Sequence, residues 1–212
     1  MSARRPDPDA PLVGDVVRLD RLRVEDAAAL FSAIGSTAVF AGGYGGGPSG
    51  LPHGPEAFAA WMPGYFPMAA GNTYAVRLVG GENDGMLVGT TTLAEFDLRN
   101  EHAHLGWTAY DPRVWGTAVN AACKRLVLGA AFGHGLGRVK IQADVLNTRS
   151  RAAIAGIGAV YEGITRRDKP RADGTWRDSA VFSVTIDDWD RVRGILESRL
   201  AAAPGPVAFR AR

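Results

Sequence analysis

One segment organises the rest of the chain, Leu105-Gly-Trp-Thr-Ala-Tyr-Asp-Pro-Arg-Val-Trp-Gly-Thr-Ala-Val-Asn120. Its first part favours a β-strand, because Trp107 and Tyr110 stand among apolar neighbours and Asp111-Pro112 ends the run. Its last part opens a helix, because apolar side chains recur at helical spacing and form one stripe, at Val119, Cys123, Leu126 and Ala130. We therefore expect a strand, a sharp glycine-containing loop and a long helix in succession.

The loop between this strand and this helix suits a phosphorylated ligand. The start of a helix leaves its first N–H groups without intrahelical partners and carries partial positive charge. Gly116 lets a ligand approach the backbone closely, Thr117 and Ala118 are small, and Arg113 adds a fixed positive charge. The loop therefore predicts a cradle for a pyrophosphate group.

The run Arg113-Val-Trp-Gly116-Thr-Ala118 resembles the R/Q-x-x-G-x-G/A loop with which GNAT acyltransferases hold the pyrophosphate of acetyl-CoA. The residues around it look like the RimJ/RimL-type branch, and the later Asn147-x-x-Ser150 and Gly158 strengthen the likeness. The resemblance covers roughly residues 12 to 190. It implies a twisted, mostly antiparallel sheet that splays open beside the loop.

Composition limits the alternatives. The chain has 212 residues, 46% of them hydrophobic, and can bury one full core. We expect a single domain over residues 12–200, with flexible tails at 1–11 and 201–212. With a net charge of +2 and no basic run interleaved with aromatic side chains, nucleic acid is not a favoured partner. The single Cys123 excludes an intrachain disulfide framework, and its place on the apolar stripe predicts a buried thiol.

Neither a signal peptide nor an apolar run of membrane-spanning length is evident, so we expect a cytoplasmic protein without a membrane partner. Apolar periodicity and turn residues predict seven strands and five helices. The strands are 16–19, 72–79, 86–95, 102–110, 138–143, 160–165 and 179–186, and the helices are 25–34, 55–66, 118–132, 147–158 and 187–200. This mixture is α+β or mixed α/β. The resemblance implies a GNAT-like central sheet of about seven strands, flanked by helices and splayed at the acyl-CoA site.

The stretch Gly42–Gly50 contains six glycines and lacks the spacing of a dinucleotide or Walker fingerprint. Glycine loses much entropy on ordering, so we expect no regular structure there. Two interpretations are open: a flexible connector, or a mobile flap over the acceptor substrate.

By resemblance, the donor is acetyl-CoA or another acyl-CoA, with succinyl-CoA possible, and no metal is needed. The oxyanion donor would be a backbone N–H around residues 107–109. Ser150 would hydrogen-bond the CoA sulfur and protonate the leaving thiolate, and Asn147 would contact the pantetheine arm, although Asn is also a preferred helix N-cap. The residues expected to bind the cofactor are Trp107, Thr108, Ala109, Tyr110, Arg113, Val114, Trp115, Gly116, Thr117, Ala118, Asn147, Ser150 and Arg151.

Three residues are candidates for the general base that acyl transfer to an amine requires. His104 stands where related sequences commonly carry a glutamate, and a neutral imidazole could take the proton directly or through water. Asp168 lies one residue before the position of a glutamate base in some relatives, a position that Lys169 fills here. Glu95, at a strand end, is the third candidate.

Two functions follow. The first is a GNAT acyltransferase that moves an acyl group from CoA to a primary amine by direct attack in a ternary complex. The acceptor would be a protein N-terminus, a lysine or a small molecule. The second is an acyl-CoA-binding regulator or sensor with weak or no catalysis, which the missing glutamate at position 104 keeps open. A homodimer or higher homo-oligomer is compatible with either.

Overall fold

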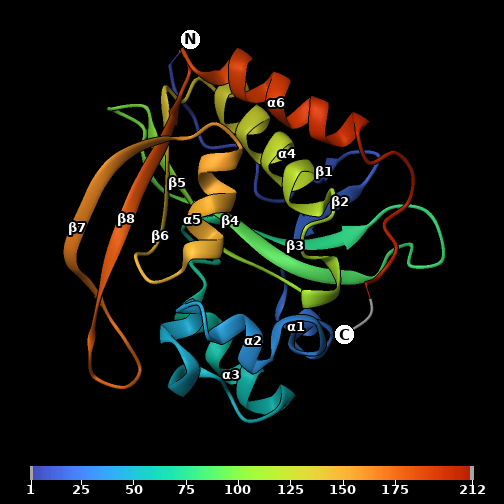
Figure 1. The fold of residues 1–212 in the computed structure, drawn as a ribbon, viewed down its shortest axis with the longest axis vertical. Helices are drawn as coiled ribbons and strands as arrows, with labels where there is room; N and C mark the ends of the chain where they lie inside the picture. Colours follow the sequence, from blue (N-terminus) through green and yellow to red (C-terminus); the bar gives the residue numbers. More distant parts are fainter. Residues whose placement is uncertain (1, 211–212) are drawn as a thin grey trace.

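The computed structural model describes residues 2–210 of the chain. They form one eight-stranded sheet in the order β1-β2-β3-β4-β5-β6-β8-β7 (Figure 1). Neighbouring strands are antiparallel, except that β5 and β6 are parallel. The strands are β1 (Leu12–Val13), β2 (Val17–Arg21), β3 (Asn72–Leu78), β4 (Leu87–Asp97), β5 (His102–Tyr110), β6 (Arg138–Asp144), β7 (Val160–Pro170) and β8 (Trp176–Thr185). The predicted α+β class with a mostly antiparallel central sheet is confirmed.

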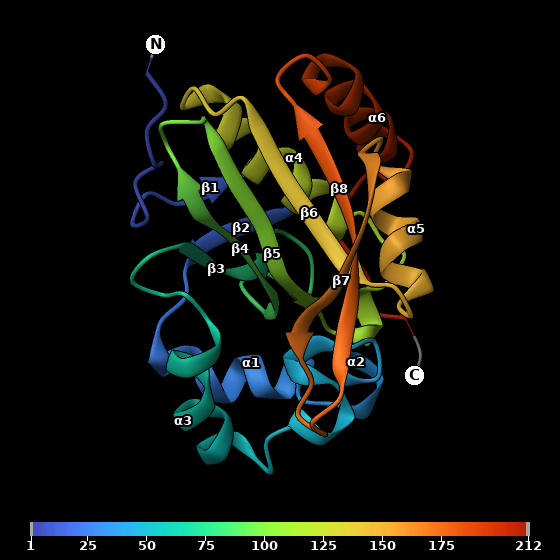
Figure 2. The same cartoon turned by 90° about the vertical axis from the view of Figure 1, so that its left-hand side faces the viewer.

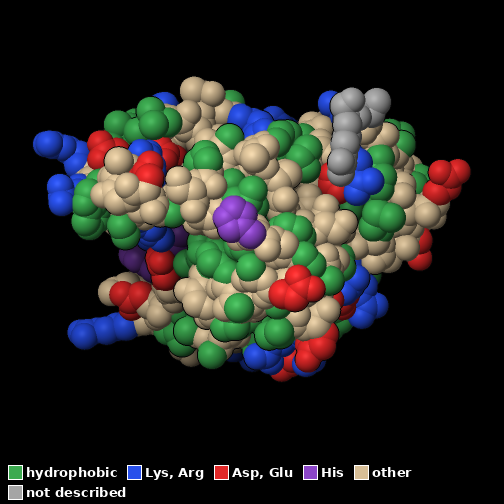
Figure 3. Space-filling view, turned by 90° about the horizontal axis from the view of Figure 1, so that it is seen from below, with side chains coloured by type: hydrophobic (Ala, Val, Ile, Leu, Met, Phe, Trp, Pro, Cys, Tyr) green, Lys and Arg blue, Asp and Glu red, His purple; other side chains and the backbone are tan. Residues whose placement is uncertain are grey.

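The α-helices of the described residues form two groups (Figures 1 and 2). They are α1 (Ala27–Ile34), α2 (Thr37–Phe40), α3 (Pro55–Tyr65), α4 (Val119–Gly133), α5 (Thr148–Gly156) and α6 (Trp189–Ala201). Helices α1 to α3 gather at one end, where α1 packs on α3 and β4, whereas α4, α5 and α6 lie together beside the sheet. Seen from the α1–α3 end, uncharged side chains cover most of the surface, and charged ones gather nearer its margin (Figure 3).

All seven predicted strands and five predicted helices are present, and one further strand and one further α-helix, both short, are additional. Strand β1 has two residues and α2 has four, too few for a periodic pattern to register. The last two strands also extend further towards their connecting turn than expected. The extension of β7 is rich in charged residues, so it lacks the apolar alternation that marks a half-buried strand.

The glycine stretch corrects one expectation, since it contains regular turns. Two 3-10 turns, η2 (Tyr44–Gly46) and η3 (Pro48–Gly50), follow α2. Positive φ angles at successive glycines allow this path, which side chains would oppose. The N–H of Gly45 donates to the hydroxyl oxygen of Tyr65 at 3.2 Å, and the N–H of Ala172 donates to the carbonyl of Gly46 at 3.0 Å. These contacts do not fit a loose connector.

Two buried cores flank the sheet. One lies against α4, α5 and α6, and the other lies between the sheet and α1 to α3. Cys123 belongs to the first core and is fully buried, as predicted, and burial raises the pKa of its thiol to about 12. No helix within residues 2–210 is both long and apolar enough to cross a membrane.

Both terminal segments touch the domain. The guanidinium of Arg5 donates to Asn72 Oδ1 and to the carbonyl of Gly71, each at 2.7 Å. Near the other end, Val207 is part of the first core, and the N–H of Arg210 donates to the carbonyl of Arg113 at 3.0 Å. The C-terminal segment therefore lies over the predicted pyrophosphate loop. The domain limits of 12–200 stay a prediction.

Candidate active site

The sheet opens between β5 and β6. These parallel strands pair only from His102 to His104, opposite Arg138 to Lys140, and their remaining residues diverge. A cavity of about 650 Å³ occupies the opening and is lined by residues 104–110 of β5, the glycine stretch and the start of α5. The predicted splay beside the loop is thus present.

A β-bulge shapes the β5 wall of this cavity. The single residue Thr91 of β4 lies opposite two residues of β5, Trp107 and Thr108. Trp107 adopts a positive φ of 47°, which is uncommon outside glycine and re-aims the backbone. Backbone groups that would otherwise pair along the sheet can therefore face the cavity, at the residues where we expected the oxyanion donor. Ala109 and Tyr110 line the cavity as well.

The predicted pyrophosphate cradle forms one end of the cavity. Gly116, Thr117 and Ala118 line it, and Gly116 has a φ of 70°, which favours glycine. The first α4 hydrogen bond runs from the N–H of Ala122 to the carbonyl of Ala118 at 2.9 Å. The N–H groups before it have no intrahelical partner and suit an anion. Val114 and Trp115 line the same end.

Arg113 does not supply the free positive charge expected of it. Its guanidinium pairs with the buried carboxylate of Asp111 at 2.6 Å and lies 4.1 Å from the ring centre of Phe209. The hydrogen bond to Asp111 raises the pKa of Arg113. Because Asp111 already neutralises this charge, we infer that Arg113 stabilises the shape of the loop. Arg113 does not line the cavity.

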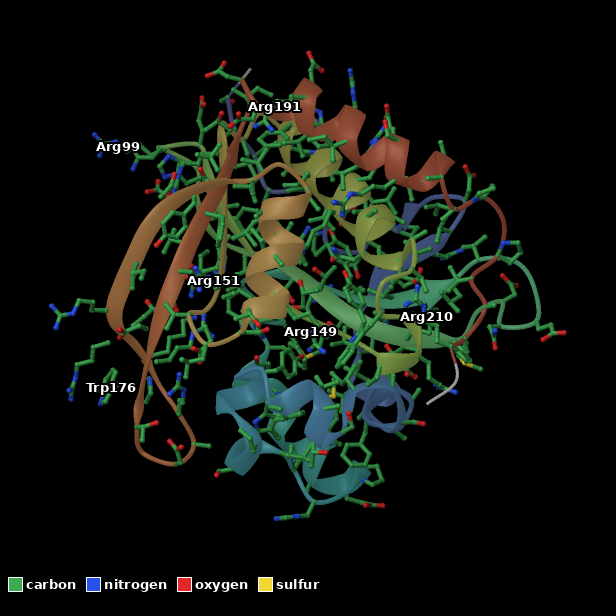
Figure 4. The ribbon with its side chains drawn as sticks, viewed as in Figure 1. Arg99, Arg149, Arg151, Trp176, Arg191 and Arg210 are labelled. Atoms are coloured by element: carbon green, nitrogen blue, oxygen red, sulfur yellow. The ribbon has the colours of Figure 1, made fainter. Side chains whose placement is uncertain are left out.

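Arg149, and not Arg151, lines the cavity. The guanidinium of Arg149 lies 3.4 Å from the ring centre of Trp115 and lines the cavity. The guanidinium of Arg151 donates instead to the carbonyl of Val145 at 3.1 Å, away from the cavity. Side chains two positions apart on a helix point to opposite sides, and the two arginines leave α5 in this way (Figure 4). Helical geometry would have favoured Arg149 over Arg151 as a cavity residue if the sequence had shown which side of α5 faces the cavity.

Asn147 and Ser150 both line the cavity, but their side chains differ in what they can bind. Asn147 Oδ1 accepts from the N–H of Ser150 at 3.0 Å, which confirms the N-cap interpretation, and its Nδ2 donates to the carbonyl of Gly42 at 2.7 Å. The amide is thus committed to the protein. The hydroxyl of Ser150 has no hydrogen-bond partner within the described part of the chain and faces the cavity.

His104 is the base candidate that the cavity contains. It is 3% exposed, and its ring lies 5.2 Å from the ring of Trp107. Its Nδ1 is 3.1 Å from Glu95 Oε2, although neither ring nitrogen is aligned for a hydrogen bond with another described residue. Burial lowers the pKa of His104, so the ring is neutral at neutral pH and can accept a proton.

Glu95 and Asp168 are poorly placed to act as the base. Neither lines the cavity. The contact with His104, followed by that with Lys140, lowers the pKa of Glu95 to about 2, which makes it a weak base. Asp168 Oδ2 accepts from Ser179 Oγ at 2.7 Å and from Gln142 Nε2 at 3.2 Å. Its carboxylate is therefore bound within the protein.

Two lysines in the cavity wall were not among the expected site residues. Lys169 Nζ lies 5.4 Å from the ring centre of Trp107, and burial lowers its pKa. Lys124, on α4, is buried and donates to Thr108 Oγ1 at 3.2 Å. Lysines are usually solvated, so only knowledge of the surrounding fold reveals them. Within residues 2–210, no group of three His, Cys, Asp or Glu side chains is arranged to hold a metal ion.

Known proteins resemble this chain in sequence and in fold. The model of the acetyltransferase (GNAT) domain matches residues 17–160. The “Putative ribosomal N-acetyltransferase YdaF” of Bacillus subtilis is 34% identical over 108 residues, which are 50% of this chain and 58% of that protein, so the match spans less than two thirds of the relative.

Solved structures cover more of the chain. A “putative acetyltransferase” from T. thermophilus is 29% identical with a TM-score of 0.76, over 90% of this chain and 96% of its own. The RimJ protein of Mycobacterium smegmatis, in complex with CoA-disulfide, has the same fold at 21% identity, with a TM-score of 0.72 over 94% of this chain and 98% of its own. The chain therefore belongs to the GNAT family of acetyltransferases, as the loop motif predicts.

Proposed function

We propose that the protein is an acyl-CoA-dependent N-acyltransferase that moves an acetyl group from CoA to a primary amine. A single observation carries the proposal: the phosphate cradle, the β5 bulge, Ser150 and His104 line one continuous cavity. His104 and the bulge lie on β5, and the cradle follows this strand in the chain. The helix start would meet the pyrophosphate, the bulge and Ser150 would meet the thioester, and the amine would approach beside His104.

The chemistry of each residue supports these roles. As the amine attacks the thioester carbonyl carbon, backbone N–H groups at the bulge would bind the developing oxyanion. Neutral His104 would take the proton that the amine loses, directly or through water. Glu95 beside Nδ1 favours the tautomer that carries its proton there and leaves Nε2 free. The hydroxyl of Ser150 would protonate the thiolate as the carbon–sulfur bond breaks.

Acetyl-CoA incubated with a panel of primary amines, including peptide N-termini, lysine side chains and small molecules, tests the proposal. We expect the release of free thiol with at least one class, dependent on the presence of amine. A succinyl-CoA arm run in parallel distinguishes donors. Calorimetric binding of acetyl-CoA without thiol release across the panel would favour the sensor function, and no binding of any CoA thioester would remove both.

A further inference from the structure

Lys124 is a buried cation that the described chain does not neutralise. It lies on the second turn of α4, is 5% exposed and lines the cavity. No carboxylate within residues 2–210 forms an ion pair with it, whereas Asp144, a buried charge of the same cavity wall, pairs with Arg171 at 2.6 Å. Buried charges without a partner are costly and rare, so this one calls for an explanation.

The hydrogen bonding of Lys124 is incomplete as well. An ammonium group has three N–H donors, and the described residues accept one, at Thr108 Oγ1. This oxygen also lies 2.8 Å from Thr91 Oγ1 and 3.2 Å from the carbonyl of Gly106, so its own capacity is used. The remaining donors of Lys124 are therefore free for a ligand in the cavity.

The location of Lys124 indicates which ligand atoms it meets. Thr108 belongs to the β5 bulge, where the backbone donors for the thioester oxygen are expected. Lys124 approaches this bulge from α4, whose first turn forms the phosphate cradle. A donor that extends from the cradle to the bulge would thus bring its thioester end towards the ammonium group.

We propose that Lys124 is a catalytic residue that, as an ammonium ion, stabilises the negative charge that forms on the thioester oxygen during acyl transfer. The proposal rests on the acyltransferase function proposed above. The amine lone pair forms the new carbon–nitrogen bond, and the carbonyl π pair moves to oxygen. Lys124 donates a hydrogen bond to this oxygen without transferring its proton. The amine loses its proton to His104, directly or through water. The pair then returns to form the amide carbonyl as the carbon–sulfur bond breaks. The thiolate takes a proton from Ser150, whose oxygen regains one from water while His104 releases its proton to solvent.

Ionisation of Lys124 gives the proposal a pH signature. Burial lowers the pKa of its ammonium to about 8, so the charge is present at neutral pH and is lost in mild alkali. The titratable group coupled to it is Cys123 on α4, which in turn contacts Tyr110 on β5, and burial raises the pKa of both. His104 and Lys169 are also titratable groups of the cavity wall. A fall of kcat at alkaline pH can therefore be assigned to Lys124 only with variants of Lys124 itself.

The test compares Lys124→Met, Lys124→Arg and the wild type, with Arg125→Met as a control that removes a cation from the outer side of the same helix. We expect Lys124→Met to lower kcat by about 100-fold, the usual effect of removing one oxyanion donor, with little change in the KM for acetyl-CoA. Its melting temperature should equal or exceed that of the wild type, because a methionine fills similar space without a buried charge. Lys124→Arg should retain measurable turnover, and its alkaline limb should disappear.

Each other outcome overturns a defined statement. A wild-type kcat and pH profile in Lys124→Met would remove the catalytic role. A parallel loss of melting temperature and activity, without recovery in Lys124→Arg, would make Lys124 a structural residue. If the wild type binds acetyl-CoA yet releases no thiol with any amine, the acyltransferase function itself fails, and the role of Lys124 in it fails too.

Discussion

Asn147 Nδ2 donates a hydrogen bond of 2.7 Å to the carbonyl oxygen of Gly42, 105 residues earlier in the chain. The same side chain caps α5 through its oxygen. One amide thus fixes both the helix that carries Ser150 and the glycine stretch, and both line the cavity. This contact fixes the position of the glycine stretch relative to the start of α5.

Asn147→Ala should remove both functions of the amide. Loss of the N-cap alone lowers the free energy of unfolding by about 1 kcal/mol, and the freed glycine stretch should exchange its amide hydrogens faster. Asn147→Asp is the matched variant, because it keeps an oxygen for the N–H of Ser150 but loses the donor to Gly42. We expect near-wild-type stability of α5 together with faster exchange over residues 42–50. If amide hydrogen exchange over residues 42–50 is unchanged in both variants, the hydrogen bond from Asn147 does not hold the glycine stretch in place.

His104→Gln should lower kcat by about 100-fold, within the range for loss of a general base. The wild-type rate should fall as the pH falls, because the proton acceptor is then occupied. Burial lowers the pKa of His104, so this acid limb should lie below the ordinary titration of histidine. Turnover measured against pH with a saturating amine checks both statements.

Glu95→Gln is the companion variant to His104→Gln. It removes the charge that favours the Nδ1–H tautomer but leaves the ring in place, so we expect a smaller loss of kcat and an acid limb at still lower pH. If both glutamine variants keep the wild-type dependence of kcat on pH, the general base is another residue.

The sequence indicated the backbone geometry of the loop after β5 better than the surroundings of the side chains in the cavity wall. The cradle depends on backbone conformation at Gly116 and on a helix start, and both leave local signals in the chain. His104, Lys124 and Lys169 owe their properties to burial by distant elements, and no local pattern reports that. The contacts of Arg113 were also not predictable from the sequence, because residue spacing alone does not identify Asp111 and Phe209 as its partners.

The fold followed the same rule. Strands with one apolar face and helices with an apolar stripe were recognised, whereas elements without such patterns were missed. The charged end of β7, which pairs with β8, and the turns within the glycine stretch are examples. The turns are held by contacts with distant segments. The N–H of Ala172 on the carbonyl of Gly46 is one such contact.

Arg149→Ala should weaken acetyl-CoA binding by about 10-fold, because its guanidinium lines the cavity beside the phosphate cradle. Arg151→Ala is the control from the same helix and should leave the dissociation constant unchanged, since its guanidinium faces Val145. Calorimetry on each variant measures the difference, and raising the salt concentration should reduce it. Equal losses in both variants would point to a general electrostatic effect and not to a contact.

Stability should rise with pH in mild alkali because of Lys124. The folded-state pKa of about 8 lies below the ordinary value of 10.5, so between these two values the unfolded chain binds more protons than the folded one. The free energy of unfolding then increases with pH, which is the opposite of the behaviour of a lysine held in an ion pair.

Urea unfolding of the wild type and of Lys124→Met from pH 7 to pH 10.5 isolates this contribution, because other titrating groups cancel in the difference. We expect the wild type to gain stability relative to the variant between about pH 8 and about pH 10.5. A difference that stays constant across this range would mean that the ammonium group of Lys124 is solvated or paired in the folded protein. The interpretation of Lys124 as a buried ammonium ion without a charged partner beside the β5 bulge would then be wrong.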